Sequence, residues 1–315
     1  MTAELDATVA ALRGLGFRLD VIVPADDPTS AVLSRDGVTV RVSASSDPSA
    51  PSAPSGPLVV PDLVPSLVVT RAGGTSVVGR AGMEYRDLIP DRQGGRFVAS
   101  HIRIPDGGPV PDDVHFHDVR FQVIVCRAGW VRVVYEDQGP PFVLAPGDVV
   151  LQPPGIRHRV LEASPGLEVV EVGCPARHPT MLDHGLTLPT ASRHPDRAYG
   201  DGQRFVHHVA ATAGWSPSGV PGWDARETAV ASATDGLAGV RHLRPDGTPT
   251  GPWAHTGELC LRYVTQGRVT VVGEDLDEDL GPDDCIVVPP GLDHRLIPTA
   301  PTTELLEITL PHPNP

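Results

Sequence analysis

The stretch HDVRFQVIVCRAGWVRVV (117–134) decides the fold, because it returns later in the chain as HTGELCLRYVTQGRVTVV (255–272). In both copies a leading histidine is followed by an apolar run, a glycine and a second apolar run, which is the pattern of a β-hairpin. A shorter motif, PPGIRHR (153–159), returns in the same order as PPGLDHR (289–295). This internal repeat predicts two copies of one β unit.

The rest of the chain after residue 58 consists of short apolar runs between turns rich in Gly and Pro. Gly and Pro number 33 and 35 among 315 residues, which favours many turns and disfavours long helices. Short, regularly spaced strands with few helical stretches are typical of β-barrels and sandwiches. The sequence therefore predicts an all-β protein whose two repeated units are barrels or sandwiches.

The N-terminal segment has a different pattern. Helical spacing of apolar residues over 4–15 predicts a helix, residues 17–23 and 29–43 predict strands, and the Asp-Gly pair at 36–37 predicts a hairpin turn. This segment resembles half of a glyoxalase-type module, without the His/Glu pair that carries the metal site of that family. We therefore expect a small α/β appendage.

Composition also sets the domain boundaries. The Ser- and Pro-rich stretch at 46–60 has few large apolar side chains, so it cannot bury enough surface to fold and is predicted to be a linker. The predicted domains are the appendage at 1–45, this linker, a first barrel at 61–185 and a second barrel at 186–315.

Charge and residue usage exclude several classes of function. The formal net charge of −14 disfavours nucleic acid and anionic membranes as partners. All 25 basic residues are Arg, and the absence of Lys excludes Schiff-base chemistry and a Walker-type phosphate loop. The four cysteines are scattered, which indicates buried, reduced thiols. With no long apolar run and no signal peptide in view, we expect a cytoplasmic protein.

Three histidines of the first copy form a candidate metal site. His115 and His117 are two residues apart in a predicted strand, so their side chains point to the same face. His158 follows a Pro-Pro-Gly turn, which can bring its strand alongside. Three neutral imidazoles that converge in a small barrel suit Fe(II), Zn, Ni, Cu or Mn. We therefore predict one divalent metal in the first barrel.

These histidines, with Gly129, Gly147 and the Pro-Gly pair at 154–155, resemble the two sequence motifs of the cupin superfamily. With the repeat, the chain from about residue 62 to 315 resembles a bicupin, which implies two double-stranded β-helix (jelly-roll) barrels. In cupins the position of Gln122 holds a metal-binding glutamate. The departure implies a three-His site in which Gln122 is either a neutral ligand or a hydrogen-bonding neighbour of the metal.

The resemblance also implies an activity. Cupin dioxygenases of the cysteine, β-diketone and gentisate types are similar in having three histidine ligands. An oxidoreductase is therefore expected that binds Fe(II) and activates O₂ beside a small polar substrate with a carboxylate, enolate or phenolate group. Zn, Mn or Ni would suit the same ligands, so a Zn- or Mn-dependent isomerase, lyase or hydrolase is one alternative. A non-enzymatic bicupin that binds a small molecule is the other.

Further side chains are candidates for the substrate pocket. His101 and Arg103 share one face of a predicted strand at 95–104. If that face borders the metal, Arg103 would bind a substrate carboxylate and His101 would act as an acid or base. The alternative is a solvated strand face. By strand parity Tyr135 and Gln152 also reach the pocket.

Three more histidines lie in the connector between the barrels. We expect them to be exposed, with one of them able to cap the mouth of the site: His178, His184 and His194.

The second copy has lost its site. Aligned on His255, the leading histidine is Trp253 and the fourth ligand position is Cys260. Only His255 and His294 remain, with Glu258 close by in sequence. Two interpretations are open: a zinc site made from these residues, or a degenerate barrel kept for packing.

The outward face of the predicted strand at 120–126 is apolar, with Phe121, Val123 and Val125 on it. This face needs to be covered by the other barrel or by a second chain. Because cupins resemble one another in pairing through barrel faces, a homodimer is expected.

Overall fold

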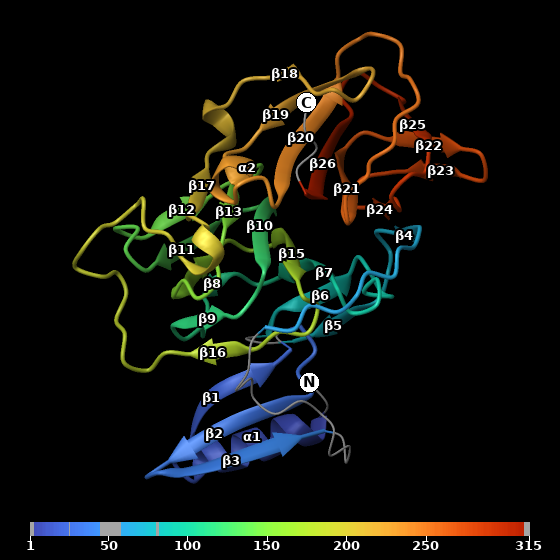
Figure 1. The fold of residues 1–315 in the computed structure, drawn as a ribbon. Helices are drawn as coiled ribbons and strands as arrows, with labels where there is room; N and C mark the ends of the chain where they lie inside the picture. The colour runs from blue at the N-terminus through green and yellow to red at the C-terminus, as the bar shows by residue number, and fades with distance from the viewer. Residues whose placement is uncertain (1–2, 25, 45–57, 80–81, 312–315) are drawn as a thin grey trace.

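The structure is a computed structural model that describes residues 3–24, 26–44, 58–79 and 82–311. An N-terminal module, a first β-barrel and a second β-barrel follow one another from the bottom to the top of Figure 1. Strands dominate, and the described residues form only two α-helices. The prediction of an all-β fold with a small α/β appendage is confirmed. Most of the predicted linker at 46–60 lies outside the described residues.

The N-terminal module is one helix on three antiparallel strands: α1 (Ala3–Gly14), β1 (Arg18–Val23), β2 (Ser30–Arg35) and β3 (Val38–Ser43). Leu5 of α1 and Leu33 of β2 are buried in a shared hydrophobic core. Asp36 and Gly37 connect β2 to β3 with φ values of 50° and 81°, which the tight hairpin turn requires. The predicted helix and hairpin are therefore present.

Two sheets form the first barrel. One sheet has the order β12-β11-β14-β9-β16, with β8 beside β14, and it continues through β1 into the N-terminal module. The other sheet has the order β17-β13-β10-β15-β7-β6-β5. The strands of the first sheet are β8 (Gly108–Pro109), β9 (His115–His117), β11 (Val131–Tyr135), β12 (Phe142–Leu144), β14 (His158–Ala163) and β16 (Thr180–Leu182). Those of the second are β5 (Ser76–Val78), β6 (Glu84–Asp87), β7 (Val98–Ile104), β10 (Phe121–Ala128), β13 (Val149–Leu151), β15 (Leu167–Cys174) and β17 (Val206–His208).

The second barrel also has two sheets, with the strand orders β18-β19-β20-β26-β21-β24-β4 and β23-β22-β25. The larger sheet contains β4 (Val68–Thr70), β18 (Ser216–Pro217), β19 (Trp223–Glu227), β20 (Gly239–Pro245), β21 (Leu259–Gln266), β24 (Cys285–Val287) and β26 (Glu304–Leu310). The smaller contains β22 (Val269–Gly273), β23 (Asp277–Leu280) and β25 (His294–Pro298). The short helix α2 (Val230–Ala233) and the 3₁₀ turns Gly200–Gly202 and Ala210–Thr212 lie in the connecting segments.

The internal repeat reappears in the strand pairing. β10 lies between β13 and β15 in the first barrel, as β21 lies between β24 and β26 in the second. Both long strands carry a register shift near their ends, before Ala128 in β10 and before Gln266 in β21. Gly129 and Gly267, each with φ near 70°, then start the turn. Corresponding positions of the two barrels can therefore be compared residue by residue.

The two barrels exchange strands. β4 lies within the range predicted for the first barrel, 61–185, but it pairs with β24 of the second. β17 lies within the range predicted for the second barrel, 186–315, but it pairs with β13 of the first. Each barrel thus contributes one strand to a sheet of the other. A single domain boundary at residue 185 therefore assigns β4 and β17 to the wrong barrels.

A continuous hydrophobic core joins the two barrels. Phe121, Val123 and Val125 of β10 belong to the same buried cluster as Leu261 and Tyr263 of β21. The second barrel therefore covers the apolar outer face that the sequence predicts to need a partner. The homodimer stays a prediction.

Ion pairs border this shared core. Glu258 of the second barrel accepts hydrogen bonds from Arg96 and Arg120 of the first. Asp283 pairs with Arg127 at 2.8 Å. Because these side chains are partly buried, the pairs are screened less by salt than exposed ones and help to fix the two barrels against each other.

All four cysteines are free and buried, as the sequence predicts. Burial raises the pKa of Cys126 to about 12, which keeps this thiol protonated. The pKa of Cys260 is likewise raised by burial to about 12. These cysteines are structural rather than nucleophilic.

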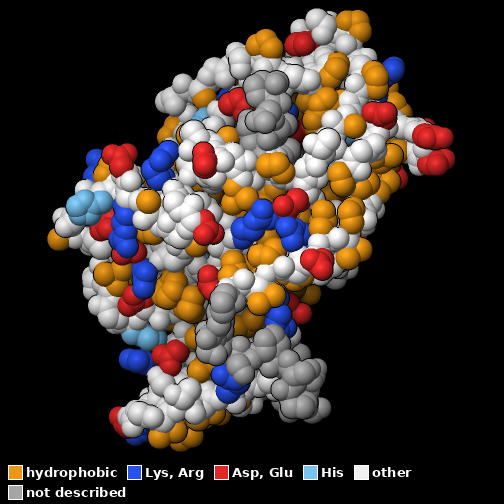
Figure 2. All heavy atoms as spheres, in the orientation of Figure 1, with side chains coloured by type: hydrophobic (Ala, Val, Ile, Leu, Met, Phe, Trp, Pro, Cys, Tyr) orange, Lys and Arg blue, Asp and Glu red, His pale blue; other side chains and the backbone are white. Residues whose placement is uncertain are grey.

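Acidic and basic side chains are interspersed on the face of the molecule shown in Figure 2. That arrangement differs from the continuous basic stripe of a nucleic-acid-binding surface. Among the helices of the described ranges, none is both long enough and apolar enough to cross a lipid bilayer.

We expect Leu261→Ala to lower the free energy of unfolding by about 2–5 kcal/mol, because Leu261 is fully buried in the core that joins the barrels. Urea denaturation followed by circular dichroism measures this change. Val143→Ala is the control, since Val143 lies on β12 with 46% of its surface exposed. Equal effects of the two substitutions would contradict a shared core.

Candidate metal centre

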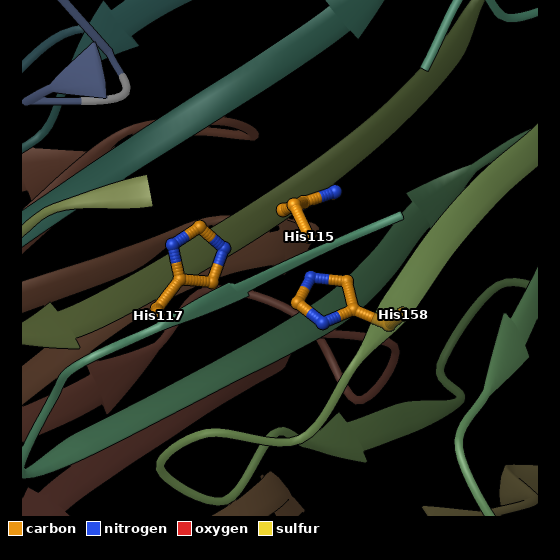
Figure 3. Close-up of side chains that lie close together, drawn as sticks. All are labelled: His115, His117 and His158. Atoms are coloured by element: carbon orange, nitrogen blue, oxygen red, sulfur yellow. The ribbon is translucent and has the colours of Figure 1, made fainter. Parts of the chain in front are cut away.

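His115 and His117 are the first and last residues of β9, and His158 begins the adjacent strand β14. His158 pairs directly with His115, which places their side chains next to each other. Figure 3 shows the three rings pointing toward one another, with centroids 4.2–5.3 Å apart. One ligand atom of each imidazole lies within 4.8 Å of the others. The structure thus brings together the three histidines that the sequence predicts as metal ligands.

Hydrogen bonds orient all three rings. His115 and His158 each donate through Nδ1 to the backbone carbonyl two residues earlier, at 2.7 and 3.0 Å. A carbonyl oxygen only accepts, so the lone pair of each ring is on Nε2. Nδ1 of His117 lies 3.2 Å from the hydroxyl of Thr180, which accepts its proton when His117 has the same tautomer. Three Nε2 atoms are then presented to one point.

The site fits a divalent metal. The three imidazoles are buried and supply neutral nitrogen donors, a set that suits Fe(II), Mn, Ni, Cu and Zn. The carboxylate of Asp112, also buried, lies 3.5 Å from Nδ1 of His115. A carboxylate in this position raises the basicity of the ring and holds its orientation, as behind many metal-bound histidines.

The histidines lie in a cavity inside the first barrel. Aliphatic side chains and Met83 make up half of its described lining, with Ile102, Ile124 and Val133 among them. Besides the three histidines, the lining has these polar side chains among others: Ser100, Gln122, Tyr135, Gln152, Glu171 and His178. The cavity therefore combines apolar walls with a polar region beside the candidate metal ligands.

Gln122 points into this cavity, in agreement with its predicted place next to the metal. Its Nε2 donates to Oε1 of Glu171 at 2.8 Å. Because a carboxylate only accepts, this bond fixes the amide so that the other end, Oε1, is the acceptor. Oε1 of Gln122 is buried and has no hydrogen-bond partner in the protein. A metal ion or a substrate donor would satisfy it.

Tyr135 and Gln152 both line the cavity, as strand parity predicts. Nε2 of Gln152 lies 2.8 Å from the hydroxyl of Tyr135, and Oε1 of Gln152 has no protein partner. Burial raises the pKa of Tyr135, so its hydroxyl stays protonated.

Glu171 is a functional candidate that the sequence analysis missed, and His178 is one that it expected to be exposed or to cap the mouth of the site. His178 is 3% exposed and lines the cavity, which corrects the expectation of an exposed connector histidine. Its Nδ1 donates to the carbonyl of Pro175 at 2.8 Å, and its Nε2 has no hydrogen-bond partner. Burial lowers the pKa of His178, so the ring is neutral near pH 7.

His101 and Arg103 do not face the cavity, and their expected position beside the metal is corrected. On β7 the side chains of Ser100, Ile102 and Ile104 line the cavity. Since alternate residues of a strand point to opposite faces, His101 and Arg103 point away from it. They line a separate depression, where His101 lies 3.4 Å from Glu168.

Glu171 has a counterpart in the second barrel. Glu171 pairs across strands with Ile124 on one side and Ser100 on the other. The residues that pair across strands with Glu307 in the same way are Arg262 and Arg241.

Both arginines bind the Glu307 carboxylate, each through Nε at 2.7 Å. Nη1 of Arg262 also lies 2.5 Å from Nε2 of His294, the counterpart of the metal-facing nitrogen of His158. In the second barrel the guanidinium of Arg262 thus lies where the first barrel has its candidate metal site.

Other contacts occupy the remaining candidates of the second barrel. Nε2 of His255 donates to the carbonyl of Val288 at 2.7 Å, and the carboxylate of Glu258 is paired with arginines of the first barrel. Trp253 replaces the leading histidine and stacks under the guanidinium of Arg262. Within the described ranges, His115, His117 and His158 form the only group of three or more residues suited to hold a metal ion.

Comparison with known proteins supports this architecture. Residues 239–308, within the second barrel, match the family model described as Cupin domain. No curated protein matches the sequence.

Three solved structures illustrate the likeness. The chain is similar to a salicylate 1,2-dioxygenase from Pseudaminobacter salicylatoxidans, with 16% identity and a TM-score of 0.57 over 80% of this chain and 86% of that chain. Protein Ylba from E. coli is similar with 10% identity and a TM-score of 0.56 over 83% and 96%. A mutant oxalate decarboxylase from Bacillus subtilis is similar with 15% identity and a TM-score of 0.53 over 84% and 81%. At these identities the likeness shows the bicupin fold alone.

We expect His158→Ala to abolish metal retention, since two imidazoles hold a divalent ion far more weakly than three. Mass spectrometry of metal content, on protein without a polyhistidine tag, measures this. His194→Ala is the control, because His194 is exposed in the connector and should leave about one equivalent per chain. His294→Ala should also retain it, and loss of metal from that variant would contradict a single site.

We also expect His294 to make stability depend on pH. Burial, and then Arg262, lower the pKa of His294 from 6.5 to about 4. Between pH 4 and pH 6.5 His294 is protonated in the unfolded chain and neutral in the folded chain. The free energy of unfolding is therefore unaffected by this group above pH 6.5 and decreases as the pH falls toward 4. Urea unfolding at pH 7 and pH 5 should show roughly 2 kcal/mol less loss for His294→Gln than for the unmodified chain. An equal loss in both proteins would refute the assignment, and His194→Gln is the control.

Proposed function

We propose that this bicupin is an oxygenase that binds one Fe(II) in its first barrel through His115, His117 and His158. The observation that carries the proposal is the convergence of three buried imidazoles whose Nδ1 atoms all meet protein oxygens. Three neutral ligands leave coordination positions open for other molecules. When bound, Fe(II) supplies a centre at which a substrate and O₂ meet and exchange electrons.

The protein's own side chains would prepare the substrate. Gln122, held by Glu171, directs its carbonyl oxygen into the cavity as a neutral ligand or an acceptor. The carboxylate of Glu171 is placed to take the proton that a hydroxyl loses when it binds as an enolate or phenolate. The aliphatic walls exclude water from the reacting groups.

The proposed reaction is a dioxygenation. Both atoms of O₂ enter the organic product, so the substrate itself supplies the electrons and no external reductant is consumed. The likeness to a salicylate 1,2-dioxygenase is compatible with this chemistry on the same fold, although fold alone does not determine a reaction.

A Lewis-acid reaction without O₂ is the second candidate. The observation that favours it is Glu171, a carboxylate in the cavity that could move a proton in an isomerase or lyase containing Mn or Zn. One of the similar structures is named as a decarboxylase, which is a class of lyase and not of oxygenase. A binding protein without turnover is the third reading.

We expect protein loaded anaerobically with Fe(II) to consume O₂ when given a hydroxylated or enolic substrate from a panel of small molecules. Mass spectrometry after reaction under ¹⁸O₂ should find both labelled atoms in the product, because a dioxygenase transfers both. His158→Ala should show no consumption, and His194→Ala should match the unmodified protein. Conversion of a substrate at the same rate without O₂ would contradict the oxygenase and favour the Lewis-acid reaction.

A further inference from the structure

Three buried hydrogen-bond acceptors in the first-barrel cavity have no partner in the protein. They are Oε1 of Gln122, Oε1 of Gln152 and Nε2 of His178. The three residues are 1–3% exposed, so bulk solvent does not satisfy these atoms. Buried polar groups are nearly always hydrogen-bonded, and three orphans in one cavity indicate a ligand that brings the donors.

The protein holds the donor end of two of these side chains elsewhere. Gln122 donates to a carboxylate and His178 donates to a backbone carbonyl, and both partners only accept, so Oε1 of Gln122 and Nε2 of His178 are left as acceptors. The amide of Gln152 contacts the hydroxyl of Tyr135, which both donates and accepts, so this pair offers the cavity a donor as well as an acceptor. The part of the cavity next to Gln122 and His178 therefore presents acceptors, and the carboxylate of Glu171 adds to them.

The same cavity offers no cationic side chain to an anion. The chain contains no Lys, and none of the described lining residues is an Arg. Arg103, the residue expected to bind a carboxylate, lies in another depression and is half exposed. The lining instead includes two acidic residues, Asp26 and Glu171. A substrate carboxylate directed away from the metal would meet acceptors of its own kind and would be repelled.

We propose that the site takes a neutral, mainly apolar molecule with two neighbouring oxygens, at least one of them a hydroxyl, such as an aromatic diol or an enolic hydroxyketone. This inference rests on the proposed function and narrows it. One oxygen would bind the metal, and the neighbouring hydroxyl would donate a hydrogen bond to Nε2 of His178. The aliphatic half of the lining receives the carbon body.

His178 is then a residue that determines specificity. Its ring lies edge-to-face with that of His117, with centroids 5.4 Å apart, so its acceptor is next to the metal ligands without belonging to their group. A site built to accept from a hydroxyl discriminates strongly against an analogue without that hydroxyl, because the acceptor is again left unpaired.

The test uses the full chain loaded with Zn(II), which binds without oxidising the ligand, and isothermal titration calorimetry. Three probes share one ring: catechol, 1,2-dimethoxybenzene, which keeps both oxygens but has no hydroxyl donor, and salicylate, which replaces one hydroxyl with a carboxylate. We expect catechol to bind at least about tenfold more tightly than either analogue. Salicylate binding as tightly as catechol, or no measurable binding of catechol, would overturn the proposal.

Variants of His178 assign the effect to its acceptor. His178→Leu should weaken catechol binding by about tenfold and leave 1,2-dimethoxybenzene unchanged, because the removed acceptor has no donor to meet in that analogue. His178→Gln, which restores an acceptor, should recover most of the affinity. His194→Leu is the matched control on an exposed histidine. An equal loss for all three probes in His178→Leu would indicate a merely structural role and refute the inference.

Zinc content and thermal melting of each protein separate this test from the proposed function. If the chain holds neither zinc nor iron, the metal-dependent function fails. The comparison of catechol with 1,2-dimethoxybenzene on the metal-free chain then still tests the acceptors. If metal is retained but salicylate is preferred, the substrate class fails while the metal centre stands.

Discussion

A carboxylate inside a β-barrel must be matched by positive charge or by hydrogen-bond donors, and the two barrels meet this requirement differently. In the second barrel, Arg241 and Arg262 surround the fully buried Glu307, and Arg262 extends the network to His294. In the first, the corresponding neighbours of Glu171 are Ser100 and Ile124. The second barrel thus has internal ion pairs at this position, whereas in the first barrel the Glu171 carboxylate accepts a hydrogen bond from Gln122 and lines the cavity.

Much of the centre was predictable because it depends on local geometry. The two-residue spacing of His115 and His117 places both on one face of a strand wherever that strand lies. The Pro-Pro-Gly turn before His158 indicated that its strand could lie beside them, and the resemblance to the cupin motifs placed Gln122 at the fourth ligand position. The first inference needs only the period of a strand, and the other two rest on short sequence motifs.

The errors arose where the face of a strand depends on its neighbours. For β7, two polar residues, His101 and Arg103, suggested a functional face, but Ile102 and Ile104 alternate with them and mark the face inside the barrel. Glu171 had a detectable signal, because a glutamate interrupts the apolar strand at the same position in both copies, as Glu171 and Glu307. His178 had none, since its burial depends on how an irregular segment after β15 packs.

The N-terminal module illustrates the same limit. The sequence predicts its helix and hairpin but not its docking, in which β1 pairs with β16 and β16 pairs with β9. The sheet that carries the three histidines thus runs without a break into the module. Asp26, just after β1, reaches the cavity lining.

The exchange of β4 and β17 between the barrels has an evolutionary consequence. After a duplication, one copy can lose its functional site while the other keeps it. The copy without a site can then ordinarily be deleted without loss of function. Here deletion of the second barrel and the connector before it would remove β17 from β13 and β24 from β4, and would expose the core that joins the barrels to water. The second barrel, which has no group of three ligands among its described residues, is therefore needed as a scaffold for the barrel with the three histidines.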